Sequence, residues 1–153
     1  MNWLEVQIET DSLNLPTEAL LQLWVDTTLK DYNKDTELVI RIVDLNEIAT
    51  LNAQYRQKNG PTNILSFPFE IPDYVEMNLL GDLVICASIL EKEAIEQNKS
   101  LNDHWAHIVI HGILHLLKFD HLIDEEAQIM EAKEIYLLSE LNIKNPYLQE
   151  SIA

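Results

Sequence analysis

The five histidines are the residues whose type and spacing could carry chemistry in this chain. All of them lie between positions 104 and 121. They could form a metal site or a packed polar cluster, or be grouped by chance, and helix geometry separates these alternatives. His111 and His115 are four residues apart, so on a helix their rings lie on one face, about 5–6 Å apart at Cβ. This spacing suits two ligands of one metal ion.

A third ligand must come from chain that turns back after this helix. His107 lies on the same face, but His107 and His115 are separated by roughly 12 Å of helix rise. Zn–N bonds of about 2.0–2.1 Å do not let three histidines stacked along one helix share an ion. His121 follows His115 by six residues, enough for a last turn and a reversal. We therefore predict one zinc ion on His111, His115 and His121, with an open fourth position, and leave His104 and His107 structural or supporting roles.

The spacing H-x3-H-x5-H is also that of metalloproteases with the extended motif H-E-x-x-H-x-x-G-x-x-H. Here Gly112 stands where that motif has its catalytic Glu, so a protease would lack its general base. Lys118 stands where it has a turn Gly; a non-glycine residue can still adopt a left-handed or bridge conformation there, at some cost. Glycine inside a helix costs about 1 kcal/mol relative to Ala, so we expect Gly112 to have a structural reason. Either it lets another backbone or the substrate come close to the helix beside the metal, or it lets the helix pack closely on the sheet.

The elements that must position these residues read as a single domain over residues 1–153. Pro68 inside the third expected strand indicates an edge position or a bulge. Asp44 and Glu47 form a capping-box pattern at the start of a helix. The acidic last helix, which includes Glu134, is interpreted as a solvated face or as a docking surface for a basic protein. We expect an α+β fold: a small mixed four-stranded sheet packed with about five helices, with the metal site on a central helix and the turn after it. The expected strands are 3–9, 37–43, 63–70 and 80–87, and the expected helices begin near 17, 44, 88, 100 and 124.

The composition limits the partners and the location. The chain has 153 residues, with 26 acidic against 10 basic ones and a formal net charge of −16. Such a surface repels nucleic acid on average, so a phosphate-bearing partner needs a local basic feature or help from another molecule. Cys86 is the single cysteine, which fits a reducing compartment, and we interpret it as a small buried side chain. Without a signal peptide or a membrane-spanning run, the sequence predicts a cytoplasmic protein.

A second group of residues lies further towards the N-terminus, around Arg56. The stretch from Leu51 to Pro68 (LNAQYRQKNGPTNILSFP), the segment Leu80-Gly81-Asp82 and the pattern H-G-x-x-H-x5-H together resemble the YbeY family of bacterial rRNA maturation factors. The resemblance covers about residues 51–134. It implies a single-strand-specific endoribonuclease that matures the 3′ end of 16S rRNA and acts in ribosome quality control. It also implies metal ligands at His111, His115 and His121 and a functionally important arginine at Arg56.

The implied mechanism is metal-assisted hydrolysis of an RNA phosphodiester. Zinc lowers the pKa of bound water towards about 7, and Arg56 can clamp phosphate with two hydrogen bonds. His115 is then catalytic as well as a ligand, and Asp120 is a candidate base or supporting partner. The net charge predicts that single-stranded rRNA is presented by the small ribosomal subunit or a ribosomal protein. Two alternatives stay open: a non-enzymatic ribosome-assembly factor with structural zinc, and a metallohydrolase of another small anionic substrate.

Overall fold

The computed structural model describes residues 1–32, 34–69, 78–119 and 123–148. Within these ranges a four-stranded mixed sheet packs with five helices, which confirms the expected α+β fold. No helix in the described ranges is both long and apolar enough to cross a membrane. The elements in chain order are β1 (Asn2–Glu9), α1 (Glu18–Leu29), β2 (Thr36–Val43), α2 (Leu45–Arg56), β3 (Ile64–Pro68), β4 (Leu79–Cys86), α3 (Ala87–Glu96), α4 (Leu101–Leu116) and α5 (Asp124–Glu140).

The sheet has the strand order β1-β2-β4-β3. β1, β2 and β4 run parallel, whereas β3 pairs antiparallel with β4 along one edge. Pro68 is the last residue of this edge strand, as its missing N–H requires. The edge position predicted for Pro68 is therefore confirmed.

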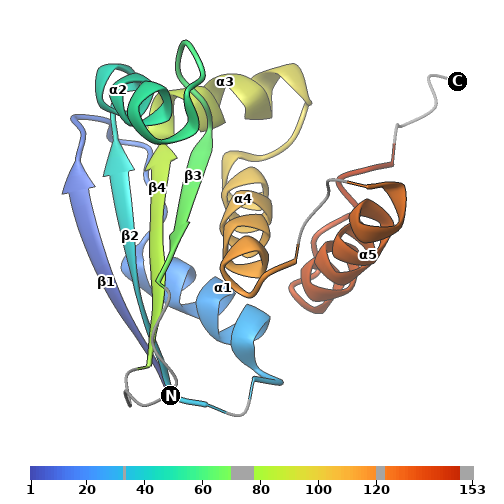
Figure 1. Ribbon diagram of the computed structural model, residues 1–153. Helices are drawn as coiled ribbons and strands as arrows, with labels where there is room; N and C mark the ends of the chain where they lie inside the picture. The colour runs from blue at the N-terminus through green and yellow to red at the C-terminus, as the bar shows by residue number, and fades with distance from the viewer. Residues whose placement is uncertain (33, 70–77, 120–122, 149–153) are drawn as a thin grey trace, which may run out of the picture.

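The two faces of the sheet are covered by different helices. Side chains alternate along a strand, so neighbouring residues of β4 face opposite sides. Leu83 and Ile85 pack into the large core shared with α1 and α4, whereas Val84 and Cys86 pack into a smaller cluster with Ile48 of α2. Figure 1 shows α4 between the sheet and α5, and α2 on the other side of the sheet. α4 is thus the central helix.

α4 forms where the sequence predicts it. Ser100 caps its N-terminus, because its hydroxyl accepts a hydrogen bond from the backbone N–H of Asp103 at 3.2 Å. Its apolar residues are buried on several sides, and Trp105 is fully buried. A helix that is apolar nearly all round must lie inside the protein, and His107, His111 and His115 are among its few partly exposed side chains.

The end of α4 turns the chain sharply. Lys118 has a left-handed φ of 75°. Its N–H donates to the carbonyl of His115, and the N–H of Phe119 donates to the carbonyl of Leu114, both at 3.0 Å. These two hydrogen bonds make a Schellman motif, which stops the helix. Of the two conformations considered possible for Lys118, the structure has the left-handed one.

Two glycines let α4 approach the sheet. A Cβ on Gly112 would lie 2.6 Å from Cδ1 of Ile64 and 2.9 Å from Cδ2 of Leu83. Of the two roles expected for Gly112, helix–sheet packing is therefore the one observed. Gly81 has a φ of 153°, and a Cβ there would lie 2.5 Å from the carbonyl oxygen of Phe67 and 2.7 Å from Leu116. The absence of a Cβ at Gly112 and Gly81 therefore allows α4 to lie this close to β3 and β4.

The capping box predicted for α2 is wrong in its contacts. Asp44 is the N-cap residue, but its side chain makes no capping hydrogen bond and accepts one from Thr10 instead. Glu47 reaches Arg41, which also pairs with Glu9 at 2.7 Å. Arg41 on the neighbouring strand thus takes the place of the backbone N–H as the partner of Glu47, and in this pair both groups are charged.

Candidate metal centre

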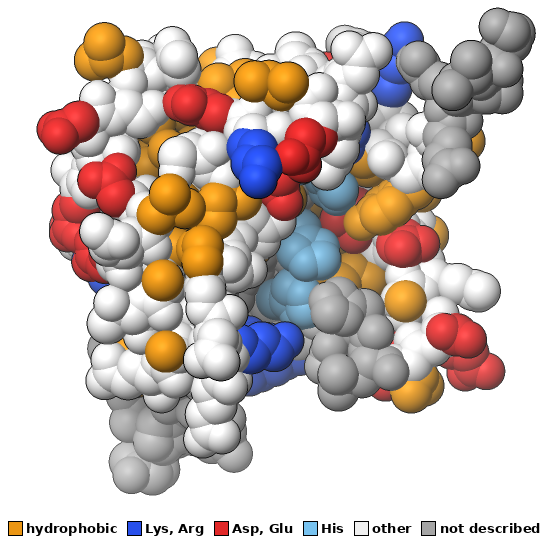
Figure 2. All heavy atoms as spheres, turned by 90° about the horizontal axis from the view of Figure 1, so that it is seen from above, with side chains coloured by type: hydrophobic (Ala, Val, Ile, Leu, Met, Phe, Trp, Pro, Cys, Tyr) orange, Lys and Arg blue, Asp and Glu red, His pale blue; other side chains and the backbone are white. Residues whose placement is uncertain are grey.

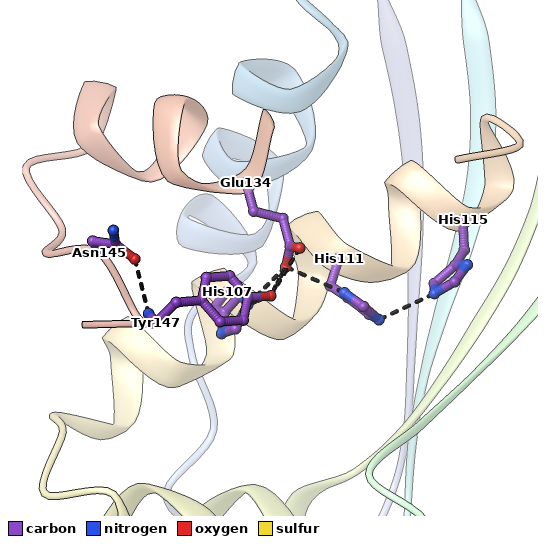
Figure 3. Close-up of polar contacts among 6 residues, drawn as sticks. All are labelled: His107, His111, His115, Glu134, Asn145 and Tyr147. Atoms are coloured by element: carbon purple, nitrogen blue, oxygen red, sulfur yellow. Dashed lines mark hydrogen bonds and ion pairs between the residues drawn. The ribbon is translucent and has the colours of Figure 1, made fainter. Parts of the chain in front are cut away.

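His111 and His115 lie on one face of α4 with their rings directed toward each other (Figure 3). Their Nε2 atoms are 3.1 Å apart. Two nitrogen ligands of one tetrahedral zinc ion, with Zn–N bonds of about 2.0–2.1 Å, lie about 3.3 Å apart. The observed separation is close to this value, so the spacing of the two nitrogens is compatible with neighbouring ligands of one small cation. The pair predicted from the four-residue spacing is thus brought together.

The protonation of His111 follows from its other ring nitrogen. Nδ1 of His111 lies 3.2 Å from Oε1 of Glu134. A carboxylate can only accept, so Nδ1 carries a proton and donates a hydrogen bond to Glu134. In the neutral form of the ring, the lone pair of Nε2 then faces His115. A ligand histidine that donates its second N–H to a carboxylate is the usual arrangement in metal sites.

His121, the predicted third ligand, and Asp120, the candidate base, both lie outside the described residues. Within the described ranges, no three His, Cys, Asp or Glu side chains come close enough together to hold a metal ion. The role of His121 therefore stays a prediction. α4 ends at Leu116, and the Schellman turn at Lys118 lies two residues before that segment begins.

Glu134 overturns the view of the last helix as a solvated acidic face at this position. Its side chain is only 1% exposed. It accepts hydrogen bonds from Nε2 of His107 at 2.7 Å, from His111, and from the hydroxyl of Tyr147 at 2.9 and 3.0 Å. Burial opposes ionisation of the carboxyl, but the hydrogen bonds from His107 and then His111 outweigh it and lower the pKa of Glu134 to about 2. Glu134 is therefore a buried carboxylate.

His107 holds Glu134 from the other side and is not placed as a metal ligand. Burial lowers the pKa of His107, against the opposing effect of Glu134, so its ring is neutral at pH 7. Its proton then lies on Nε2, facing Glu134, and its Nδ1 is buried without a partner among the described residues. Tyr147 packs edge-on against the ring, with centroids 5.4 Å apart. The supporting role expected for His107 agrees with this geometry.

A cleft of about 380 Å³ opens beside this network. Figure 2 shows the histidine side chains together in a hollow of the surface. His104 is buried at the cleft and donates to Glu93 at 3.0 Å, and burial lowers the pKa of Lys99. The cleft therefore offers a cation, a carboxylate and ring edges next to His111. Its polar and aromatic lining residues include Asn63, Glu93, Lys99, His104, His107 and Tyr147.

Arg56 is the predicted site residue that the structure does not join to the histidines. It is the last residue of α2, which lies on the opposite face of the sheet from α4, and its side chain is exposed. It makes no ion pair or hydrogen bond within the described ranges, so its guanidinium is available to a ligand. Asp82 lies on the same face of the sheet as α2. It precedes Leu83 on β4, and Leu83 faces α4 on the other side. Burial raises the pKa of Asp82.

Sequence reasoning missed Glu134 and Tyr147. A signal for Glu134 was present, because it stands in a stripe with Met130, Leu137 and Leu138, which have the i−4, i+3 and i+4 spacing of one helix face. A charged residue inside an apolar stripe indicates a buried group with partners. Tyr147 follows the helix in irregular chain, where no periodicity indicates which way a side chain points.

Known proteins are similar to this chain in sequence and in fold. A family model described as endoribonuclease YbeY matches residues 5–142. The chain belongs to the YbeY family. A relative from Colwellia psychrerythraea (strain 34H / ATCC BAA-681), named endoribonuclease YbeY, is 53% identical over 151 residues, which cover 96% of this chain and 97% of that protein. The resemblance drawn from the motifs is confirmed, and membership of this family makes the chain a hydrolase of the endoribonuclease class.

The fold of this YbeY protein also matches a solved structure. The solution structure of TM1509 from Thermotoga maritima has a TM-score of 0.56, with 97% of this chain and 99% of that chain covered. The two sequences are 23% identical, so this match shows a shared fold. The α+β architecture expected from the sequence is confirmed by it.

Proposed function

We propose that this YbeY protein is a metal-dependent endoribonuclease that cuts single-stranded RNA, with one zinc ion on His111, His115 and His121. The observation that carries the proposal is the His111–His115 pair, whose Nε2 atoms are 3.1 Å apart while Nδ1 of His111 donates to Glu134. Two histidines oriented in this way match neighbouring ligands of a zinc site. His121 supplies the third ligand in this proposal.

The donor set fits zinc in its chemistry. Neutral imidazole is a common ligand of zinc, and three of them leave the ion its full positive charge. When bound, zinc acts as a Lewis acid that polarises a phosphoryl oxygen and acidifies a coordinated water. The side chain of His111 is 23% exposed, so an RNA phosphate can reach the histidine face from the cleft.

Arg56 serves in this proposal to bind a phosphate and stabilise the charge that develops on it. Its guanidinium can hold two phosphate oxygens with parallel hydrogen bonds. It is exposed and makes no ion pair within the described ranges, which supports its availability for RNA. The cleft beside His111 would receive the nucleotide next to the cut phosphate, and Lys99 would add a positive charge there.

The substrate we propose is the 3′ end of 16S rRNA, matured in the cytoplasm as part of ribosome assembly and quality control. A net charge of −16 weakens electrostatic capture of free RNA. We infer that the small ribosomal subunit or a ribosomal protein presents the strand. Cleavage of isolated RNA is then weak. The local contacts of Arg56 and Lys99 with phosphate weaken further as the salt concentration rises.

The test compares three preparations on one defined single-stranded RNA: metal-loaded protein, protein stripped by a chelator, and metal-treated His115→Ala. The proposal expects cleavage by the first preparation alone. The variant controls for contaminating nucleases, since it passes through the same purification. Equal cleavage by His115→Ala would overturn the proposal. Bound zinc without any cleavage would instead favour a structural metal in an assembly factor.

A further inference from the structure

Glu134 occupies a position in α5 where the fold calls for an apolar side chain. Its neighbours on the same face, Met130, Leu137 and Leu138, are buried in the core. A carboxylate is expensive to remove from water unless hydrogen bonds satisfy it. The side chain of Glu134 is nonetheless only 1% exposed, so its partners must account for its presence there.

Three donors from two parts of the chain converge on Glu134 (Figure 3). His107 and His111 reach it from successive turns of α4, at 2.7 and 3.2 Å from Oε1. Tyr147 reaches both carboxylate oxygens from the segment after α5. The backbone N–H of Tyr147 donates to the side chain of Asn145 at 2.8 Å, which fixes the turn that carries the ring.

The contact with His111 has a consequence that the other two contacts lack. Because Glu134 accepts a hydrogen bond from Nδ1–H, neutral His111 must present the lone pair of Nε2 to the space shared with His115. Without this acceptor, a neutral imidazole could equally carry its proton on Nε2, where it would block binding of a cation. His107 and Tyr147 bind Glu134 from other directions and prevent its carboxylate from rotating away.

We propose that Glu134 is a positioning residue for the metal centre, which selects the ligating form of His111, with His107 and Tyr147 holding the carboxylate in place. This inference rests on the proposed function, because it takes His111 to be a metal ligand. Nothing in the role of Glu134 requires contact with RNA. The network joins α5 and the segment around Tyr147 to the metal site on α4, so these parts contribute to zinc affinity without supplying a ligand.

The first test is the zinc affinity of Glu134→Gln, measured by competition with a chromophoric chelator. The amide keeps the size of the side chain but offers one acceptor oxygen and two N–H donors to three existing donors. Removal of a carboxylate behind a ligand histidine weakens metal binding by about 10- to 100-fold. Glu125→Gln removes the same charge from an exposed position of α5, and we expect it to bind zinc within about threefold of the parent protein.

Tyr147→Phe separates the contact with His111 from the rest of the network. It removes one donor to Glu134 and leaves Nδ1 of His111 untouched. We expect a loss of zinc affinity smaller than that of Glu134→Gln. Glu134→Asp keeps the charge but shortens the side chain by one methylene, so it also retracts the acceptor from His111. It serves as the second variant if Glu134→Gln does not fold.

The second test reads the tautomer directly, by NMR of the imidazole nitrogens in zinc-free protein. We expect the proton of His111 on Nδ1 in the parent and redistributed to Nε2 in Glu134→Gln. A purely structural Glu134 would lower the melting temperature and leave both the tautomer and the zinc affinity of the folded fraction unchanged. A parent protein with the proton of His111 on Nε2 would overturn the proposal without any variant.

The two proposals fail in different ways. If the parent does not bind zinc, or if His115→Ala binds it equally well, the proposed metal centre is wrong. If the parent and His115→Ala behave as expected but Glu134→Gln binds zinc as tightly as Glu125→Gln does, the metal centre stands and the positioning role of Glu134 is wrong.

Discussion

Replacing Lys118 with Gly should stabilise the protein. Lys118 is the left-handed residue of the Schellman motif that ends α4, with a φ of 75°. A side chain with a Cβ strains this conformation by about 1–2 kcal/mol, and glycine is free of that strain. Glycine also makes the unfolded chain more flexible, which removes about 0.4–1 kcal/mol of the gain. The net expectation is a stabilisation of about 0.5–1 kcal/mol.

This gain is measurable by urea unfolding of chelator-treated protein, where zinc cannot add its own binding free energy. We expect a higher urea midpoint with an unchanged m-value, and a melting temperature raised by about 1–4 °C. Lys118→Ala is the matched control, because it removes the long side chain and keeps the Cβ. It should unfold within about 0.5 kcal/mol of the parent. A glycine variant less stable than the alanine variant would refute the assignment of a left-handed residue at this turn.

Two further substitutions and one labelling experiment have expected outcomes of different kinds. Gly81→Ala should lower the free energy of unfolding by about 2–5 kcal/mol in urea, because its Cβ would meet backbone atoms of β3 at a φ that disfavours alanine; a stability near that of the parent would contradict this packing. Arg56→Lys should reduce RNA cleavage by about tenfold or more at an unchanged urea midpoint, since the charge remains and the two-pronged fork is lost; undiminished cleavage would mean that Arg56 is misassigned. The thiol of Cys86 is fully buried, so a thiol reagent should modify it only as fast as the protein opens, and immediate labelling of native protein would show otherwise.

The sequence predicts the histidine pair and its helix because both depend on residues that are close together in the chain. Ser100 begins α4 through a contact three residues away, and helix periodicity alone places His111 beside His115. The motif that has glycine at position 118 allowed a left-handed turn there, and the structure has one. These features depend on residues close together in the chain, so they survive the details of tertiary packing.

Features that depend on distant partners were not predictable in the same way. The capping box of α2 is absent because Asp44 and Glu47 bind Thr10 and Arg41, which lie in other parts of the fold. The burial of Glu134 arises because α5 lays its apolar stripe against α4, and the pattern of acidic residues along α5 suggested the opposite. A charged residue within an apolar stripe, such as Glu134, indicates a buried group with partners.

Stepwise addition of zinc to metal-free protein, with cleavage of a single-stranded RNA followed at each step, tests the central claim most directly. If cleavage requires one zinc ion on His111, His115 and His121, the cleavage rate rises linearly with added zinc and levels off at one zinc per chain. His121→Ala then shows no such rise. Cleavage that is already complete before zinc is added, or that His121→Ala retains in full, would contradict the account.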